Sequence, residues 1–180
     1  MKKLILLCFL ILNTCTFKQL FDIEGYIKGI VEEYRPESSS RIAHCIMKYS
    51  SKYNLEPLLI TSLARKESQF KHNAYNSTTE ARGLGQIIDK YWRYALWHID
   101  NGRLGKHINK KGYTNITQIK RYYYRIGYGT ELMCYAARSC IDIADGDVRK
   151  GMWIYGGGRG SGSCQTHMSN YLEDIFENFD

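Results

Sequence analysis

The fold of this 180-residue chain is decided by the stretch PLLITSLARKESQF, residues 57–70. Pro57 suits the first position of a helix, because its ring presets φ and an N–H at that position would have no partner within the helix. Leu59, Leu63 and Phe70 recur at the spacing that places apolar side chains on one helical face. The stretch therefore predicts an amphipathic helix whose apolar face belongs to the core.

Helical periodicity continues on both sides of this stretch. Apolar residues predict a helix from Ile23 to just before Pro36, and the serine run Ser38–Ser40 predicts the cap of a second helix that ends at Asn54. Downstream, the apolar pattern predicts a long helix from about Tyr122 to Ala144. The chain thus reads as one helix after another.

The remaining segments are shorter or irregular. A short helical segment is predicted through Tyr155, followed by a glycine-rich loop and a last helix over residues 168–179. Periodicity is poor over about residues 90–121, which predicts an irregular insertion. Because no stretch alternates between apolar and polar residues for long, we predict a mainly α single domain with little or no β structure.

The composition agrees with a folded domain that is exported. Apolar residues make up 44% and charged residues 24% of the chain, which excludes a disordered protein. Lys2 and Lys3 precede the apolar run Leu4–Leu12, which is the pattern of a secretory signal. We therefore predict a signal peptide over 1–16, a functional domain over 17–180, and a location in the periplasm or cell envelope. Cys15 leaves a lipoprotein signal open, and we expect membrane attachment only if that residue is lipidated.

The formal net charge of +7 indicates an anionic partner. Nucleic acid, anionic lipid and the polymers of a cell wall all fit, and export favours the wall. The basic and aromatic run 120–125 would suit stacking on nucleic-acid bases, but sugar rings or plain solvation explain it equally well. We therefore expect no nucleic-acid partner.

Four cysteines follow the predicted leader: Cys45, Cys134, Cys140 and Cys164. In an exported protein these indicate disulfides rather than a zinc site, and we predict no metal and no cofactor. If Cys134 and Cys140 share a helix, they point in different directions and should not pair with each other. The pairing is otherwise left open.

Glu67 is the residue best placed for chemistry. It follows Leu63 by four residues and Leu59 by eight, so its carboxylate projects from the apolar face of the predicted helix. Partial burial disfavours the charged form and raises a carboxyl pKa, which suits a general acid. The alternative is that Glu67 turns outward at the helix end and pairs with Arg65 or Lys71.

A second group of candidate residues follows in the stretch Ala81–Ile87. Gly83 and Gly85 allow a close approach of the backbone, and Gln86 offers a donor and an acceptor for sugar amides and hydroxyls. The alternative is a plain turn followed by core residues. Tyr155 is a candidate for positioning Glu67 or contacting a sugar, and its alternative is likewise a place in the core.

These segments together resemble the soluble lytic transglycosylase family, whose domain is goose-lysozyme-like. The matching elements are Glu67-Ser68-Gln69-Phe70, Gly83-Leu84-Gly85-Gln86-Ile87, Tyr155-Gly156-Gly157-Gly158 and a late tyrosine, Tyr171. The resemblance extends over about residues 45–175. Two positions depart from the family pattern, since Gly85 replaces a methionine and Gly156 replaces an asparagine.

The resemblance implies a lysozyme-like fold and cleavage of the β-1,4 bond between N-acetylmuramic acid and N-acetylglucosamine in peptidoglycan. Glu67 would be the catalytic residue, acting first as acid and then as base, so that the muramyl C6 hydroxyl closes onto C1 and leaves a 1,6-anhydro end. The implied substrate-binding residues are Ser68, Gly83, Leu84, Gln86, Tyr155 and Tyr171.

The family mechanism needs no second carboxylate, so we interpret Glu80 and Asp89 as surface acids. The sequence leaves two alternatives open: a hydrolytic muramidase, in which water attacks, and a catalytically weak protein that binds peptidoglycan during assembly. A small enzyme of this kind also resembles those that open the wall for a secretion or conjugation machine, which makes such machinery a candidate partner.

Overall fold

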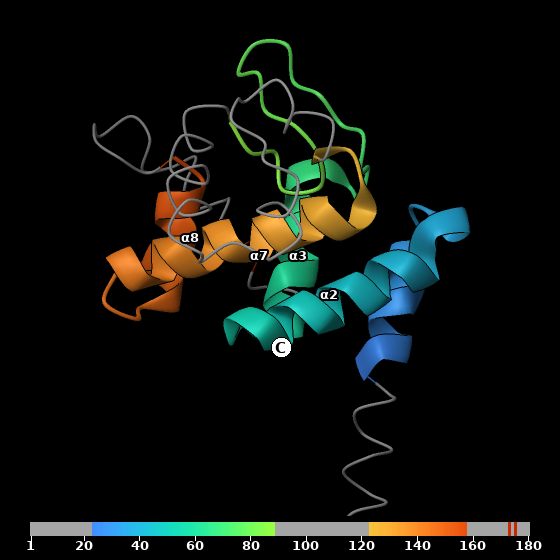
Figure 1. Ribbon diagram of the computed structural model, residues 1–180, viewed down its shortest axis with the longest axis horizontal. Helices are drawn as coiled ribbons and strands as arrows, with labels where there is room; N and C mark the ends of the chain where they lie inside the picture. The colour runs from blue at the N-terminus through green and yellow to red at the C-terminus, as the bar shows by residue number, and fades with distance from the viewer. Residues whose placement is uncertain (1–22, 89–122, 158–172, 174, 176–180) are drawn as a thin grey trace, which may run out of the picture.

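A computed structural model describes residues 23–88, 123–157, 173 and 175 of the chain. The described part is helical: a first helix spans 23–32 and is followed by the 3-10 turn η1 (Pro36–Ser38), α2 (Ser39–Tyr53), α3 (Pro57–Ser68), α7 (Ile126–Ile143) and α8 (Val148–Tyr155) (Figure 1). Within these residues the only β-type pairing is two isolated bridges. The prediction of a mainly α fold is confirmed.

The start of α2 differs in detail from the sequence prediction. Ser38 occupies the cap position, but its side chain makes no capping hydrogen bond. The hydroxyl of Ser39 instead donates to the carbonyl of Pro36 over 3.0 Å, because the preceding 3-10 turn brings that carbonyl within reach. At the other end, Asn54 adopts the left-handed conformation with φ 52°, and the helix ends there as predicted.

α3 begins at Pro57, as the sequence predicts, and ends at Ser68. Gln69 and Phe70 both have positive φ values of 50° and 58°, so the chain reverses directly after the helix. Phe70 therefore lies beyond α3, and its predicted place on the same helical face is wrong. Its side chain is nevertheless fully buried, because the reversal folds it back toward the core and its N–H bonds the carbonyl of Ala64.

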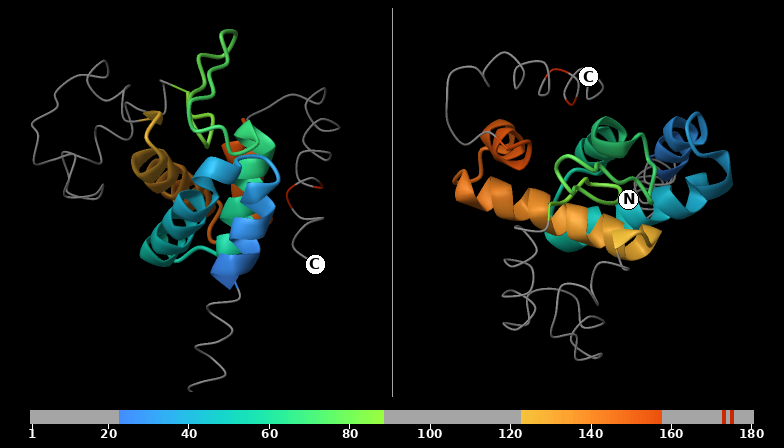
Figure 2. Two further views of the ribbon diagram at one scale, coloured as in Figure 1. Left: turned by 90° about the vertical axis from the view of Figure 1, so that its right-hand side faces the viewer. Right: turned by 90° about the horizontal axis from the view of Figure 1, so that it is seen from above.

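α7 is shorter than the predicted helix over 122–144. It begins at Ile126, and Arg125 before it has extended backbone angles. α7 packs against both α2 and α8 (Figure 2). α7 lies beside the segment that follows α3, since a Cβ at Gly85 would lie 2.8 Å from Cγ of Met133, and the hydroxyl of Tyr155 at the end of α8 reaches the same segment.

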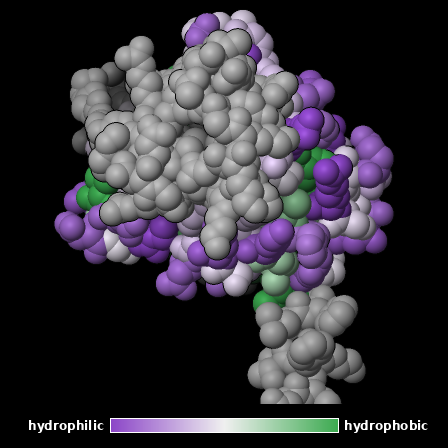
Figure 3. Space-filling view, in the orientation of Figure 1, coloured by the Kyte–Doolittle hydropathy of each residue, from purple (hydrophilic) through white to green (hydrophobic). Residues whose placement is uncertain are grey.

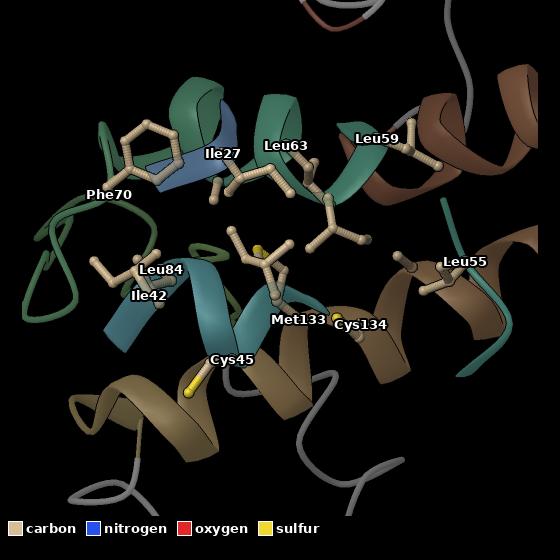
Figure 4. Close-up of a cluster of buried hydrophobic side chains, with 14 of the residues drawn as sticks. Ile27, Ile42, Cys45, Leu55, Leu59, Leu63, Phe70, Leu84, Met133 and Cys134 are labelled. Carbon is tan, nitrogen blue, oxygen red and sulfur yellow. The ribbon is translucent and has the colours of Figure 1, made fainter. Parts of the chain in front are cut away.

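The core lies between the helix 23–32, α2, α3 and α7. Side chains far apart in sequence meet there: Ile27, Leu63, Phe70, Leu84 and Met133 are all fully buried (Figure 4). Ile175, near the end of the chain, also belongs to this cluster. Because Leu84 inserts into the core, it anchors the irregular segment 74–88 against the helices.

In the face drawn in Figure 3, polar side chains predominate and hydrophobic ones form small separate spots. Among the described helices, none combines the length and the apolar character that a membrane crossing requires. The predicted leader over 1–16, the insertion over 90–121, Cys164 and Tyr171 lie outside the described residues, as does most of the predicted last helix.

Candidate active site

Glu67 lies in the last turn of α3 and its side chain is partly buried. Leu59 and Leu63, which precede it on the same face, are 2% and 0% exposed. The position therefore follows from the spacing, because the apolar face of the helix carries the carboxylate to the border of the core. The Glu67 side chain is thus neither fully buried nor fully exposed to solvent.

Ser68 connects α3 to the segment that carries the second motif. Its hydroxyl lies 2.9 Å from the carbonyl oxygen of Leu84 and 3.1 Å from that of Ala64. A hydroxyl has one proton, which these two acceptors share. The bond to Leu84 holds the motif Gly83–Ile87 beside the end of α3.

The segment 81–88 folds into a tight turn. Arg82 and Ile87 exchange two backbone hydrogen bonds of 3.0 and 3.1 Å, and the N–H of Gln86 donates to the carbonyl of Gly83. Gly83 has φ +72°, and a Cβ there would lie 2.6 Å from the carbonyl oxygen of Tyr123. Glycine is required at this position, and the close backbone approach that it allows is to the protein's own chain.

Gly85 makes room for the hydroxyl of Tyr155. That hydroxyl donates to the carbonyl of Gly85 over 2.7 Å. A Cβ at position 85 would lie 2.5 Å from the Tyr155 oxygen and 2.8 Å from Cγ of Met133 on α7. The departure of Gly85 from the family pattern therefore has a physical reason, since Tyr155 and Met133 fill the space that a side chain would need.

Tyr155 reaches this place as the last residue of α8, whose start is capped by Asp147 accepting a hydrogen bond from the N–H of Lys150. Burial raises the pKa of Tyr155 well above its usual range, and the nearby negative charge of Glu67 raises it further. The phenol is therefore neutral at any physiological pH and serves as a hydrogen-bond donor. Glu67 and Tyr155, 88 positions apart, are close enough to interact electrostatically.

Gln86 has φ 44° and its side-chain amide donates to the carbonyl of Gly83 over 3.1 Å. Together with Tyr155 it borders a small pocket of about 50 Å³. The pocket is lined by Gly85, Gln86, Ile87, Ile88, Ala136, Cys140 and Tyr155. This volume is well below the roughly 300 Å³ of a typical ligand pocket, so a sugar ring would have to lie at its mouth.

The other candidate residues fall into different places. Leu84 is fully buried and its carbonyl accepts from Ser68, which favours the core alternative for this side chain. Gly156 caps the end of α8 and is exposed. Glu80 is exposed, as expected of a surface acid, whereas Asp89 and Tyr171 lie outside the described residues.

For Cys45 and Cys134 the expectation of disulfides is wrong. Cys45 and Cys134 are buried free thiols, and Cys140 is buried as well. Burial raises the pKa of the Cys134 thiol far above its usual range, so it is protonated and unreactive. Within the described residues, no group of three His, Cys, Asp or Glu side chains is arranged to hold a metal ion.

Two features of the site were missed from sequence. Met133 and Tyr123 come from the region around α7 and set the shape of the glycine turn. Arg82 lies over the ring of Tyr75 and donates to the hydroxyl of Tyr124. The two bridged positions, Tyr75 and Arg82, sit in a segment too short to show the alternation of a strand, so no sequence signal joins them.

One comparison with known proteins finds a family for part of the chain. Residues 44–96 match the model of the family described as Transglycosylase SLT domain. The match includes most of α2, all of α3 and the glycine turn, hence Glu67, Ser68 and Gln86, and it ends before α7 and α8. No curated protein and no solved structure matches the chain. The predicted family resemblance is confirmed over the matched segment.

Proposed function

Because residues 44–96 carry the match to the transglycosylase SLT domain, we propose that this chain is an exported lytic transglycosylase of peptidoglycan. The match supports peptidoglycan glycan strands as the substrate. We further propose that the bond cut is the β-1,4 link from N-acetylmuramic acid to N-acetylglucosamine, with a 1,6-anhydro end as the product. The observation that carries the proposal is the placing of a partly buried Glu67 beside the glycine turn and the neutral Tyr155.

Glu67 would perform both proton transfers. In the first step its protonated form gives a proton to the glycosidic oxygen while the bond from that oxygen to C1 of the muramyl sugar breaks. In the second step the resulting carboxylate takes the proton of the C6 hydroxyl, and the C6 oxygen forms a new bond to C1. The proton lost in the first step is thus regained in the second, and no water is consumed.

Tyr155 and Ser68 would support Glu67 by fixing its surroundings. The hydroxyl of Tyr155 donates a hydrogen bond to the carbonyl of Gly85, and the hydroxyl of Ser68 donates one that the carbonyls of Leu84 and Ala64 share. These bonds connect the end of α3 and the end of α8 to the glycine turn. Preorganised groups need not rearrange during the reaction, which is how positioning lowers a barrier.

The decisive experiment is product analysis on purified peptidoglycan with the full chain. We expect mass spectrometry to find muropeptides lighter than their hydrated forms by one water molecule, and we expect Glu67→Gln to release none. Hydrated ends would show a muramidase instead. Binding to sacculi without any soluble product would show a wall-binding protein. That alternative stays open because Gly156 replaces an asparagine of the family pattern.

Export is a separate part of the proposal and rests on the sequence of residues 1–16. Fractionation of cells that express the full chain should place it in the periplasm or envelope, and deletion of residues 2–12 should retain it in the cytoplasm. Recovery of the intact chain from the cytoplasm alone would contradict export. A secretion or conjugation machine as partner remains a hypothesis, which pull-down from an envelope fraction would test.

A further inference from the structure

An exposed aromatic side chain lies on the irregular segment 74–88, next to the turn of the candidate active site. Tyr75 is 49% exposed, although it sits in a segment whose neighbours are tied to the protein by backbone hydrogen bonds. Asn76 donates to the carbonyl of Ala81, and Gly83 donates to the carbonyl of Ala74, each over 2.9 Å. The backbone on both sides of Tyr75 is therefore held in place while the ring remains accessible.

The ring of Tyr75 is also held from one side. The guanidinium of Arg82 lies 4.3 Å from the ring centroid, which places it over one face. A nitrogen of the same guanidinium donates to the hydroxyl of Tyr124 over 2.7 Å. The backbone carbonyl of Tyr124 is in turn 2.7 Å from Nδ1 of His72. Arg82 is thus fixed between two tyrosines, while Tyr75 remains 49% exposed.

The position of Tyr75 relative to the site follows from the two bridges. Tyr75 pairs with Arg82, and Arg82 pairs with Ile87, so the three backbones run side by side. Ile87 borders the pocket that Gln86 and Tyr155 also line. Two neighbouring backbones lie about 4.8 Å apart, so Tyr75 is displaced from the pocket edge by about 10 Å, close to the length of one disaccharide. Figures 1 and 2 show the segment 74–88, drawn in green, above the end of α3.

We infer that Tyr75, backed by Arg82, is a platform on which a sugar ring of the glycan strand stacks, outside the site where the bond is cut. An aromatic ring with one face supported and the other accessible offers a flat apolar surface, and the C–H groups of a pyranose form a matching apolar face. Because the platform is already ordered, binding would cost little side-chain entropy. This inference rests on the proposed function, since it extends the glycan site along the same turn.

The test is a binding measurement that needs no catalysis. Full-length Glu67→Gln protein is titrated with solubilised glycan strands, and its affinity is compared with that of Glu67→Gln/Tyr75→Ala and Glu67→Gln/Tyr75→Phe. We expect the alanine variant to bind about three- to tenfold more weakly, as the loss of one aromatic contact implies, and the phenylalanine variant to bind as the parent does. Tyr26→Ala in the same background is the matched control, because Tyr26 is 59% exposed on the helix 23–32, at the other end of the described structure (Figure 1).

The outcomes separate this inference from the proposed reaction. Equal affinity of the Tyr75→Ala variant and its parent would overturn the platform, as would an equal loss for Tyr26→Ala or for Tyr75→Phe. Failure of the parent to bind glycan strands at all would overturn it too. If binding depends on the Tyr75 ring but the wild-type protein releases no muropeptides, the platform stands and the transglycosylase reaction falls.

Discussion

At the scale of single residues, the site depends on one carboxylate and on two glycines that bring other groups to it. Glu67 is carried to the border of the core by Leu59 and Leu63 on the same helical face. Gly83 admits the backbone at Tyr123, and Gly85 admits the hydroxyl of Tyr155. Each glycine therefore acts through the absence of a side chain.

Replacement of Glu67 by glutamine should abolish activity without unfolding the protein. An amide of the same size can neither give nor take the proton, so we expect the rate of muropeptide release to fall by about 10²–10⁴-fold or more. The midpoint temperature of thermal unfolding should be unchanged or slightly higher, since a partly buried charge has been removed. Glu80→Gln, which alters an exposed acid, is the matched control and should keep full activity. Full activity of Glu67→Gln would contradict the assignment.

Gly85→Ala should damage both stability and activity. The added Cβ would meet the Tyr155 oxygen at 2.5 Å and Met133 Cγ at 2.8 Å, so at least one of these must move. Overpacking of this kind costs about 1–3 kcal/mol in the free energy of unfolding, measurable by urea titration. Gly29→Ala is the control, because nothing lies within 4 Å of a Cβ there and alanine favours a helix. Wild-type stability of Gly85→Ala would show that the close approach is not required.

At the scale of elements, two hydrogen bonds connect α3 and α8 to the glycine turn. Ser68 ties the end of α3 to the turn at Leu84, and Tyr155 ties the end of α8 to the same turn at Gly85. Both bonds end on backbone carbonyls of neighbouring residues. The turn is therefore the element through which the two helices are set relative to each other near Glu67.

Ser68→Ala should loosen this connection. The carbonyl of Leu84 would lose the hydrogen bond from the Ser68 hydroxyl next to the core, which we expect to cost about 1–2 kcal/mol in the free energy of unfolding. Release of muropeptides should fall more than stability alone explains, because the turn beside Glu67 is no longer fixed. Ser68→Thr keeps the hydroxyl and should retain most of both properties. Equal activity of the alanine and threonine variants would exclude a positioning role.

Lys52 and Glu131 join α2 to α7 by an ion pair in which Glu131 is only 3% exposed. Lys52→Met should leave that carboxylate buried without its cation, at a cost of about 1–3 kcal/mol in urea unfolding, less than for a fully buried pair because the Lys52 side chain is 39% exposed. Lys52→Met/Glu131→Leu should recover most of the loss, since two apolar residues replace the pair. A double variant no more stable than the single one would argue against this explanation.

At the scale of the whole molecule, the core holds several ionisable groups in their neutral forms. Burial and the charge of Glu131 raise the pKa of Tyr49 to about 12, and burial raises the pKa of Tyr53 and Tyr155 as well. Burial also raises the pKa of the Cys45 and Cys134 thiols. Folding therefore stabilises the protonated form of all these groups.

The consequence is a loss of stability in alkali. Between pH 10, the ordinary pKa of tyrosine, and about 12, Tyr49 ionises in the unfolded chain but not in the folded one. The unfolded state then binds fewer protons, so the free energy of unfolding falls as the pH rises through this window, and below it the contribution is fully present. Urea titrations from pH 9 to 11.5 should show the decline, and Tyr49→Phe should make it less steep. An unchanged slope for Tyr49→Phe would refute the account.

Sequence alone was sufficient for the end of α2, the start of α3 and the helical face that carries Glu67, because these depend on local rules. Pro57 and Asn54 mark a helix start and a helix end through backbone preferences of single residues, and the spacing of Leu59, Leu63 and Glu67 fixes which face the acid occupies. The segment with the family match lies in this same part of the chain. Phe70 was placed wrongly, since two consecutive left-handed residues reverse the chain where periodicity continues the pattern.

Only the tertiary structure decided what surrounds that acid. It brings the hydroxyl of Tyr155 to Gly85 and turns the Ser68 hydroxyl toward Leu84. It also places Met133 where a side chain at position 85 would lie. Cys45 and Cys134 are left as free thiols. The two hydrogen bonds join residues that are 16 and 70 positions apart in the sequence. No local preference encodes such pairings, because they result from how α7 and α8 pack against the rest of the core.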